Sequence, residues 1–220
     1  MDDPLQYSGY VYNKLDDQWI DLGVVQNWIK SCETHYADHC WTSSPISTTT
    51  FSGRPLWIID VHNSCLVNVE AKNVRRYITL SYVWSHSPAT SLTTNNLKKF
   101  REDQALTNES MPLAVSHAIS LTKLLGEMYL WADRLCICQE GDEKAKFDQL
   151  KIMAEIYANS YFTIVATQGN NADNGLRGIF DVTPPRQLVR PLRYRDHYEA
   201  ISIQAETLMS TNWHCRGWTF

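Results

Sequence analysis

Long apolar runs are missing from this sequence: no stretch of about 18 apolar residues occurs, so we expect nothing in it to span a membrane. The first residues, Met1-Asp2-Asp3-Pro4, are acidic and lack the apolar region of a signal peptide. An excess of basic residues is missing too, because 20 Lys and Arg stand against 24 Asp and Glu, for a net charge of −4. A general nucleic-acid binder carries a basic face, so that class of protein is excluded.

Four short patterns of catalytic and nucleotide-binding proteins are also absent. The sequence contains no G-x-G-x-x-G fingerprint, no Walker A loop, no G-x-S-x-G elbow and no H-E-x-x-H zinc motif. Any chemistry must therefore come from residues that the fold brings together. The six cysteines are expected to be reduced thiols of a cytoplasmic or nuclear protein, because nothing marks the chain for secretion. Of the two compartments, we predict the cytoplasm.

Aromatic residues, in contrast, are abundant. The chain of 220 residues contains eight Trp and eleven Tyr, and apolar residues make up 44% of it. A chain of this length removes roughly 70% of its unfolded surface from water, which is enough for a substantial core. The aromatic load favours a well-packed interior or a protein interface.

Residues 1–55 are predicted to form an irregular N-terminal flank. Apolar residues recur there every three to four positions over Asp16–Ile29, which predicts one short amphipathic helix. Residues 56–220 are predicted to form the main domain, which opens with two strand-like runs, Leu56–Val61 and Cys65–Val69. The turn residues between these runs predict a β-hairpin.

Strands and helices alternate through the centre of the chain. The predicted elements are strands over Tyr77–Trp84, Met128–Ala132 and Tyr161–Ala166, with helices over Ser110–Gly126 and Asp142–Asn159 between them. Such alternation implies right-handed parallel crossovers, with helices on the faces of the sheet. The predicted fold class is therefore α/β, a parallel doubly wound sheet flanked by the N-terminal helix and the hairpin.

Both central helices carry sequence signals for their ends or faces. In the first, Ser110 is a candidate cap, Pro112 suits the first turn, and Gly126 stands where the C-terminus needs a positive φ. In the second, five apolar residues share one face and are expected to point into the core: Phe147, Leu150, Met153, Ala154 and Tyr157.

Ligands of open parallel sheets bind at the carboxyl ends of the strands, near the point where the strand order reverses. The first strand ends in Tyr82, Trp84 and Ser85, and the third is followed by Gln168 and Gly169. We predict that these five residues line a binding crevice.

Asp133, at the end of the second strand, is the candidate catalytic residue of this crevice. Its carboxylate could hydrogen-bond a ribose hydroxyl or orient a nucleophile. Alternatively, Asp133 caps a turn or pairs with Arg134 or Arg177.

Cysteine and histidine cluster between residues 32 and 40. Cys32, His35 and Cys40 could hold zinc, with Cys65 or Cys215 as a further ligand. The alternative is a helix end with incidental polar residues, because the second knuckle of a standard zinc site is absent.

Two further cysteines, Cys136 and Cys138, lack the wider spacing of zinc ligands and are expected to be small buried residues. A Cys–His dyad for nucleophilic attack would need His86 or His117 nearby. Nothing in the sequence brings either histidine close.

Several blocks of this sequence match a known domain in order. They are Tyr77–Trp84 (YITLSYVW), Met111–Leu113 opening a helix, Tyr129–Gln139 (YLWADRLCICQ), Met153–Ser160 (MAEIYANS) and Thr163–Ala166 (TIVA). The sequence resembles the fungal heterokaryon incompatibility (HET) domain over about Tyr77–Phe220, and the block that ends at Gln139 is highly specific. The segments Trp28–Cys40 and Leu56–Asp60 also resemble the usual lead-in.

The sequence departs from the pattern of this family in two places. Ser85 stands where the first strand is commonly followed by Gly, and its side chain narrows the approach of a ligand. The closing residues Arg216–Phe220 resemble an Arg-x-Trp-Thr-Phe-Gln-Glu motif that stops before Gln-Glu. We therefore expect the domain to be truncated at its C-terminus.

The resemblance implies a role in fungal non-self recognition and regulated cell death, a form of innate immunity. The family is also similar in strand order to TIR domains, some of which cleave NAD with a helix-borne Glu that follows a Trp-Cys pair. Here Trp213-His214-Cys215 lies at a comparable place, and the expected Glu lies beyond Phe220.

Three functions follow as alternatives. The chain acts in cell death through self-association or contacts with partner domains, or it hydrolyses NAD as a substrate in the strand-end crevice, or it is a structural module of a larger enzyme. Fold alone does not decide among them.

Overall fold

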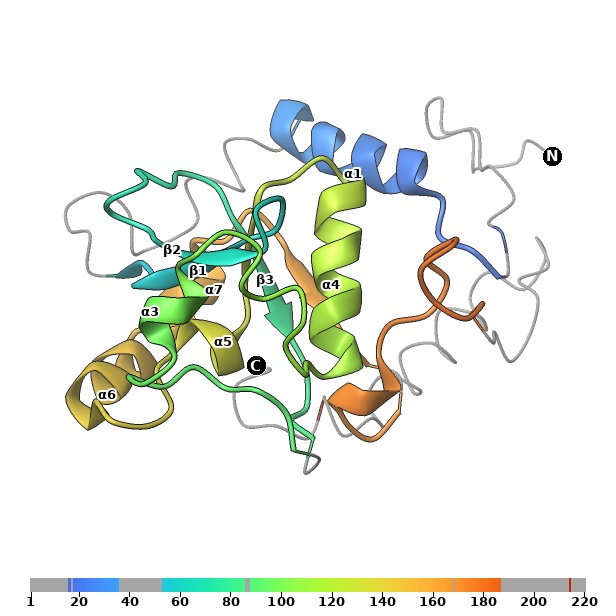
Figure 1. Ribbon diagram of the computed structural model, residues 1–220. Helices are drawn as coiled ribbons and strands as arrows, with labels where there is room; N and C mark the ends of the chain where they lie inside the picture. The colour runs from blue at the N-terminus through green and yellow to red at the C-terminus, as the bar shows by residue number, and fades with distance from the viewer. Residues whose placement is uncertain are drawn as a thin grey trace, which may run out of the picture.

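A computed structural model describes residues 16, 18–35, 53–85, 88–167, 169–186 and 214 of the chain. Its centre is a five-stranded sheet with helices on both faces (Figure 1). The strands are β1 (Trp57–Asp60), β2 (Cys65–Asn68), β3 (Ile78–Ser81), β4 (Tyr129–Trp131) and β5 (Thr163–Val165). Their order across the sheet is β2-β1-β4-β3-β5.

The strands β3, β4 and β5 are parallel, as predicted. β3 pairs in parallel with β4 on one side and with β5 on the other. The hairpin of β1 and β2 is also confirmed, but it does not stand apart as a flank. β1 pairs antiparallel with β4 through Ile59 and Leu130, so the sheet is mixed rather than wholly parallel. This pairing satisfies backbone groups along an edge of β4 that would otherwise be open.

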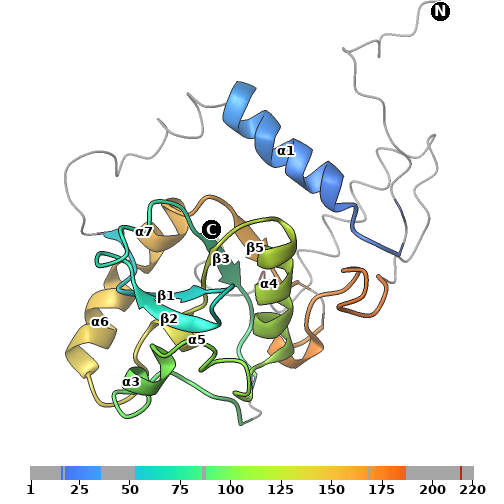
Figure 2. The same ribbon diagram turned by 45° about the horizontal axis from the view of Figure 1, so that its top comes forward.

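The helices in chain order are α1 (Leu22–His35), α3 (Leu97–Phe100), α4 (Leu113–Leu124), α5 (Asp133–Cys136), α6 (Glu143–Lys151) and α7 (Met153–Ala158). A 3₁₀ turn, η2 (Ala172–Asn174), follows β5. Figure 2 shows α4 on one side of the sheet and α7 on the other. No helix in the described ranges is long and apolar enough to cross a membrane.

Successive side chains of a strand point to opposite faces of the sheet, so each strand contributes apolar side chains to the core on both faces. Ile78, Leu80 and Leu130 are fully buried and share one face of the sheet, the face that α4 covers. The opposite face carries Trp131, whose indole meets the ring of Tyr157 on α7 edge to face at 5.4 Å. Burial of each large apolar side chain stabilises the fold by about 1.5–3 kcal/mol.

Two hydrogen bonds fasten α7 to β3 and to Tyr77, the residue before that strand. The Tyr77 hydroxyl donates to the carbonyl oxygen of Ile156 at 2.7 Å, and the Tyr157 hydroxyl donates to that of Leu80 at 3.2 Å. Burial raises the pKa of Tyr77 above its ordinary value, so this phenol stays a neutral donor.

The prediction of one continuous helix over Asp142–Asn159 is wrong. The chain breaks at Ile152 into α6 and α7, and only α7 follows the sheet, with Ile156 fully buried. Phe147 and Leu150 on α6 are 58% and 43% exposed, contrary to the prediction that they face the core. The same prediction is wrong for Ala154, which is exposed, whereas Met153 and Tyr157 are partly buried against the core. The break interrupts the apolar stripe, so the part on α6 turns to solvent.

The ends of the other helices also differ from the predictions. α1 begins at Leu22 rather than near Asp16, because the Asp21 carboxylate accepts the backbone N–H of Val24 and so caps the helix. α4 begins after Pro112, and not at Ser110. Gly126 follows α4 with φ +80°, which confirms the predicted glycine at its C-terminal end.

The contrast between α6 and α7 gives a prediction for stability. We expect Ile156→Ala to lower the free energy of unfolding by about 2–5 kcal/mol, because it leaves a cavity between α7 and the sheet. Phe147→Ala should change it by less than about 0.5 kcal/mol, because that ring is exposed. Urea unfolding followed by circular dichroism measures both values, and equal losses would contradict this arrangement.

Candidate functional site

The carboxyl ends of β3 and β4 bring several predicted site residues together. Tyr82, Trp84 and Ser85 lie in the segment that directly follows β3, and Asp133 is the first residue of α5, which follows β4 after a single residue. Because β3 and β4 are parallel neighbours, their ends meet at the same edge of the sheet. Asp133 is therefore adjacent to residues that come about 50 positions earlier in the chain.

The Asp133 carboxylate holds this edge together by accepting hydrogen bonds. One oxygen accepts the indole N–H of Trp84 at 2.8 Å, and the other accepts the backbone N–H of Arg134 at 2.7 Å. Burial and the negative charge of the adjacent Asp133 carboxylate raise the pKa of Tyr82 well above its ordinary value. The Tyr82 hydroxyl therefore stays protonated at physiological pH.

Arg134 completes what we call the Asp133 cluster: Tyr82, Trp84, Asp133 and Arg134. Its side chain is buried, and its guanidinium donates to the carbonyl oxygens of Ala89 at 2.8 Å and Thr90 at 3.2 Å. The guanidinium also lies over the Trp84 ring, 5.1 Å from its centroid. Arg134 therefore fixes the loop after β3 against the start of α5.

A second contact closes the same edge from the other side of β3. The hydroxyl of Ser85 donates to the carboxylate of Asp173 in η2, the turn that follows β5. Gly169 is exposed at the start of this turn region, and the side chain of Asn174 accepts the next backbone N–H, that of Asn170. Gln168 lies outside the described residues, so its predicted place in the crevice stays a prediction.

These segments also relate the chain to known proteins. A profile of the family described as heterokaryon incompatibility protein (HET) matches residues 77–220, which is more than half of the chain. The chain belongs to the HET family. No curated protein and no solved structure matches it. β3, β4, β5 and the Asp133 cluster all lie inside the HET domain, whereas α1 and the β1–β2 hairpin precede it.

The sequence does not reveal Arg134 and Asp173 as residues of this edge of the HET domain. Arg134 stands beside Asp133, and the sequence suggests only that it could pair with that carboxylate. Asp173 lies in a run of Asn and Gly that carries no pattern pointing to Ser85. Their contacts join segments 44 or more residues apart, which local spacing does not reveal.

His117 anchors the η2 region to α4. Its Nδ1 accepts the backbone N–H of Leu176 at 3.1 Å, so this nitrogen is unprotonated and the ring is neutral. Gly175 has φ +65°, and a Cβ at this position would lie 2.5 Å from Nδ1 of His117. Only glycine lets the backbone approach the imidazole so closely. No described cysteine is found in contact with His117, so a Cys–His dyad at this histidine gains no support.

The predicted metal ligands are only partly described. Cys32 is exposed on α1, His35 is the last residue of that helix, and Cys40 lies outside the described residues. Within the described ranges, no three His, Cys, Asp or Glu side chains are grouped to hold a metal ion. The zinc site stays a prediction.

The Cys136–Cys138 pair behaves largely as expected. Cys136 is fully buried, and burial raises the pKa of its thiol to about 12, so the thiol stays protonated at neutral pH. Cys138 is only partly buried, and its thiol donates to the carbonyl oxygen of Glu140.

The anchor at His117 gives a prediction for pH dependence. Burial lowers the pKa of His117 below its ordinary value of 6.5. The unfolded chain therefore takes up more protons than the folded chain just below pH 6.5, so this residue makes stability fall as the pH drops through that window. Above pH 6.5 its contribution is constant.

Thermal unfolding of wild type and His117→Asn between pH 5 and pH 7.5 measures this effect. Asn keeps an acceptor for the Leu176 N–H but cannot be protonated, so the variant should lose less stability on acidification than wild type. His62→Asn, at an exposed histidine of the β1–β2 turn, is the matched control and should keep the wild-type dependence. Identical slopes for wild type and His117→Asn would refute the assignment.

Proposed function

We propose that this HET-family chain acts in heterokaryon incompatibility, as a trigger of regulated cell death on non-self recognition, by associating with a second copy of itself. The family match supports the incompatibility role in general terms. The outer face of α6 supports the mode of action, and it is the observation that carries the proposal.

Polar side chains hold α6 to the domain, whereas an ordinary amphipathic helix packs its apolar face on the core and exposes its polar face. The Lys146 ammonium donates to the carbonyl oxygen of Gln139 at 2.9 Å, and the Gln149 side chain accepts the backbone N–H of Leu56 at 2.9 Å. Phe147 and Leu150 point outward, and no residue of α6 is buried. Two large apolar side chains on an exposed helix face are typical of a protein interface.

The charges at the two ends of this face make it complementary to itself. Glu143, Phe147 and Lys151 recur every four residues and so share one stripe of α6. In a two-fold pair with the helices antiparallel, Glu143 of one copy would face Lys151 of the other, at both ends of the contact. Phe147 and Leu150 would then pack across the two-fold axis.

Leu150→Glu should abolish self-association, because it places a charge at the centre of the apolar contact. Leu124→Glu is the matched control: Leu124 is also a helical leucine, 45% exposed against 43% for Leu150, but it lies on α4. It should associate like wild type. Sedimentation velocity over a concentration series measures both, and a wild type that stays monomeric up to about 500 μM would refute the proposal.

Charge reversal tests the antiparallel geometry itself. Glu143→Lys and Lys151→Glu should each weaken association, because each places like charges opposite one another. An equimolar mixture of the two variants should regain it, since every contact in the mixed pair joins opposite charges. If the mixture associates no better than either variant alone, the two-fold arrangement is wrong.

A second candidate is NAD hydrolysis of the TIR type at the strand-end edge. The order β4-β3-β5 supports it, because the first strand of the parallel set lies between the next two, as in doubly wound sheets that bind nucleotides. The Asp133 cluster lies at the carboxyl ends of two of these strands. In this candidate Trp84, Ser85, Gln168 and Gly169 contact the nucleotide.

Asp133 would then stabilise the oxocarbenium-like ribose while water adds to its anomeric carbon and gives up one proton to the solvent. The carbon–nitrogen bond breaks with its electron pair going to the nicotinamide ring, which leaves neutral. Against this role, the Asp133 carboxylate already accepts hydrogen bonds from Trp84 and from the Arg134 amide. Because these hydrogen bonds already use the carboxylate, NAD hydrolysis is less well supported than self-association.

Nicotinamide release from NAD, followed by chromatography, tests the second candidate. Asp133→Asn should lower the rate at least about 100-fold if the carboxylate stabilises the transition state, while Asp148→Asn on the exposed side of α6 leaves it unchanged. Circular dichroism of both variants establishes that they fold. The assay uses wild-type protein that carries the expected Glu as well as the HET domain, and absence of release by it at every protein concentration would exclude the candidate.

A further inference from the structure

A pocket of about 280 Å³ lies at the opposite end of the parallel strands from the Asp133 cluster. Ile29, Cys32 and Glu33 of α1 form one side of it. Arg75 and Arg76, which lead into β3, and the segment 158–162, which links α7 to β5, form the rest. The pocket therefore lies between α1, which precedes the matched HET region, and the amino ends of two HET-domain strands.

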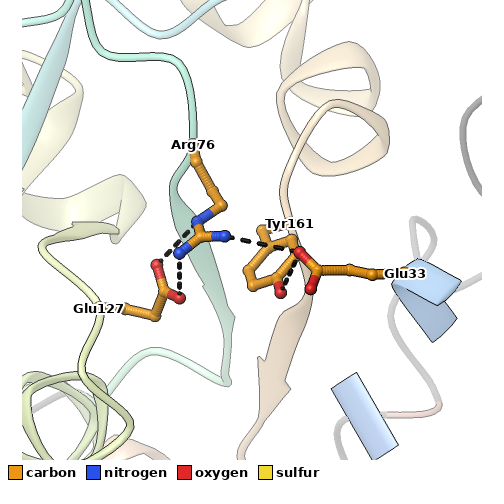
Figure 3. A network of polar contacts seen from close by, with 4 residues as sticks. All are labelled: Glu33, Arg76, Glu127 and Tyr161. Atoms are coloured by element: carbon orange, nitrogen blue, oxygen red, sulfur yellow. Dashed lines mark hydrogen bonds and ion pairs between the residues drawn. The ribbon is translucent and has the colours of Figure 1, made fainter. Parts of the chain in front are cut away.

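A network of polar contacts builds one wall of this pocket (Figure 3). Arg76 binds both carboxylate oxygens of Glu127, at 2.8 and 3.1 Å, and lies 3.5 Å from Glu33. The Tyr161 hydroxyl donates to Glu33 at 2.7 Å, and the Arg76 guanidinium lies 4.5 Å from the centroid of the Tyr161 ring. The network fastens α1 to the sheet and engages both carboxylates.

Arg75 is the charged residue of the pocket that takes no part in this network. It is exposed, it lines the pocket, and its guanidinium makes no hydrogen bond or ion pair with any residue that the structure describes. Most of the remaining lining is apolar, with Ile29 on α1 and Phe162 before β5. A ligand that satisfies this lining has an apolar body and one anionic group.

We propose that this pocket binds a small, flat apolar molecule with a single carboxylate or sulfonate group. The anionic group pairs with Arg75, whose planar guanidinium binds carboxylates through two parallel hydrogen bonds. The apolar body lies against Ile29 and Phe162. The volume of about 280 Å³ lies just below the range for small-molecule sites, about 300–1,000 Å³, so the ligand is no larger than two fused rings with a short side chain.

Ligand binding here would couple α1 to the HET domain. The pocket exists only while α1 is docked, because three of its lining residues come from that helix. A ligand that binds the docked state and not the released state shifts the equilibrium toward docking by mass action. This inference does not depend on how the chain acts in incompatibility, since α6 and the Asp133 cluster take no part in the pocket.

The probes are 1-naphthaleneacetate and its neutral amide, 1-naphthaleneacetamide, titrated by calorimetry into the whole chain. We expect the acid to bind about tenfold more tightly than the amide. Arg75→Gln should bring the affinity for the acid down to that for the amide, and Arg101→Gln, at an exposed arginine outside the pocket, should change neither. Ala158→Leu fills part of the pocket and should weaken both compounds at least fivefold.

Alkylation of Cys32 by iodoacetamide locates the bound probe. Cys32 lines the pocket and is exposed, so the acid should slow its modification, measured by peptide mass mapping, without slowing that of Cys138. Melting curves establish that each variant folds. The proposal is overturned if neither probe binds at millimolar concentration or if acid and amide bind equally. It is also overturned if Ala158→Leu does not weaken binding and the acid does not slow the alkylation of Cys32.

Discussion

Parallel pairing of β3 with both β4 and β5 is the constraint on which the rest of the structure depends. A parallel neighbour on each side requires two crossover connections: one runs from β3 to β4, and the other runs from β4 back past β3 to β5, so they cross the sheet in opposite directions. α4 and α7 therefore cover opposite faces of the sheet, and β3 is buried on both of them. The same pairing sends the carboxyl ends of β3, β4 and β5 to one edge of the sheet and their amino ends to the other.

The two edges have become chemically different. At the carboxyl edge, Asp133 uses its oxygens to tie Trp84 to the start of α5, and Arg134 ties down the loop after β3. Most hydrogen-bonding groups of the Asp133 cluster thus bind other parts of the protein. At the amino edge, Arg76 and Tyr161 hold α1 over a pocket in which Arg75 is still available to a ligand. Ligands of parallel sheets generally bind at the carboxyl edge, but here more of the polar groups at that edge are engaged in contacts within the protein than at the amino edge.

The break at Ile152 decides which apolar surface the molecule presents. Before the break, α6 is held by Lys146 and Gln149, so Phe147 and Leu150 remain outside. After it, α7 packs Ile156 against the sheet. One helical sequence thus supplies both a part of the core and an exposed face with opposite charges at its two ends, which suits contact between copies of the chain.

The sequence alone determined the strands, the hairpin, the parallel alignment of β3, β4 and β5 and the glycine after α4, because these depend on local periodicity, turn chemistry and crossover length. It also placed Trp84 and Asp133 at one edge, since parallel strands end together. Only the tertiary structure decided that Asp133 binds Trp84 and the Arg134 amide, that Ser85 meets Asp173, and that the stripe on α6 faces solvent. The first two depend on the mutual position of segments far apart in the chain, and the third depends on the break of the helix at Ile152. The spacing of residues along one helix or strand does not encode either of these causes.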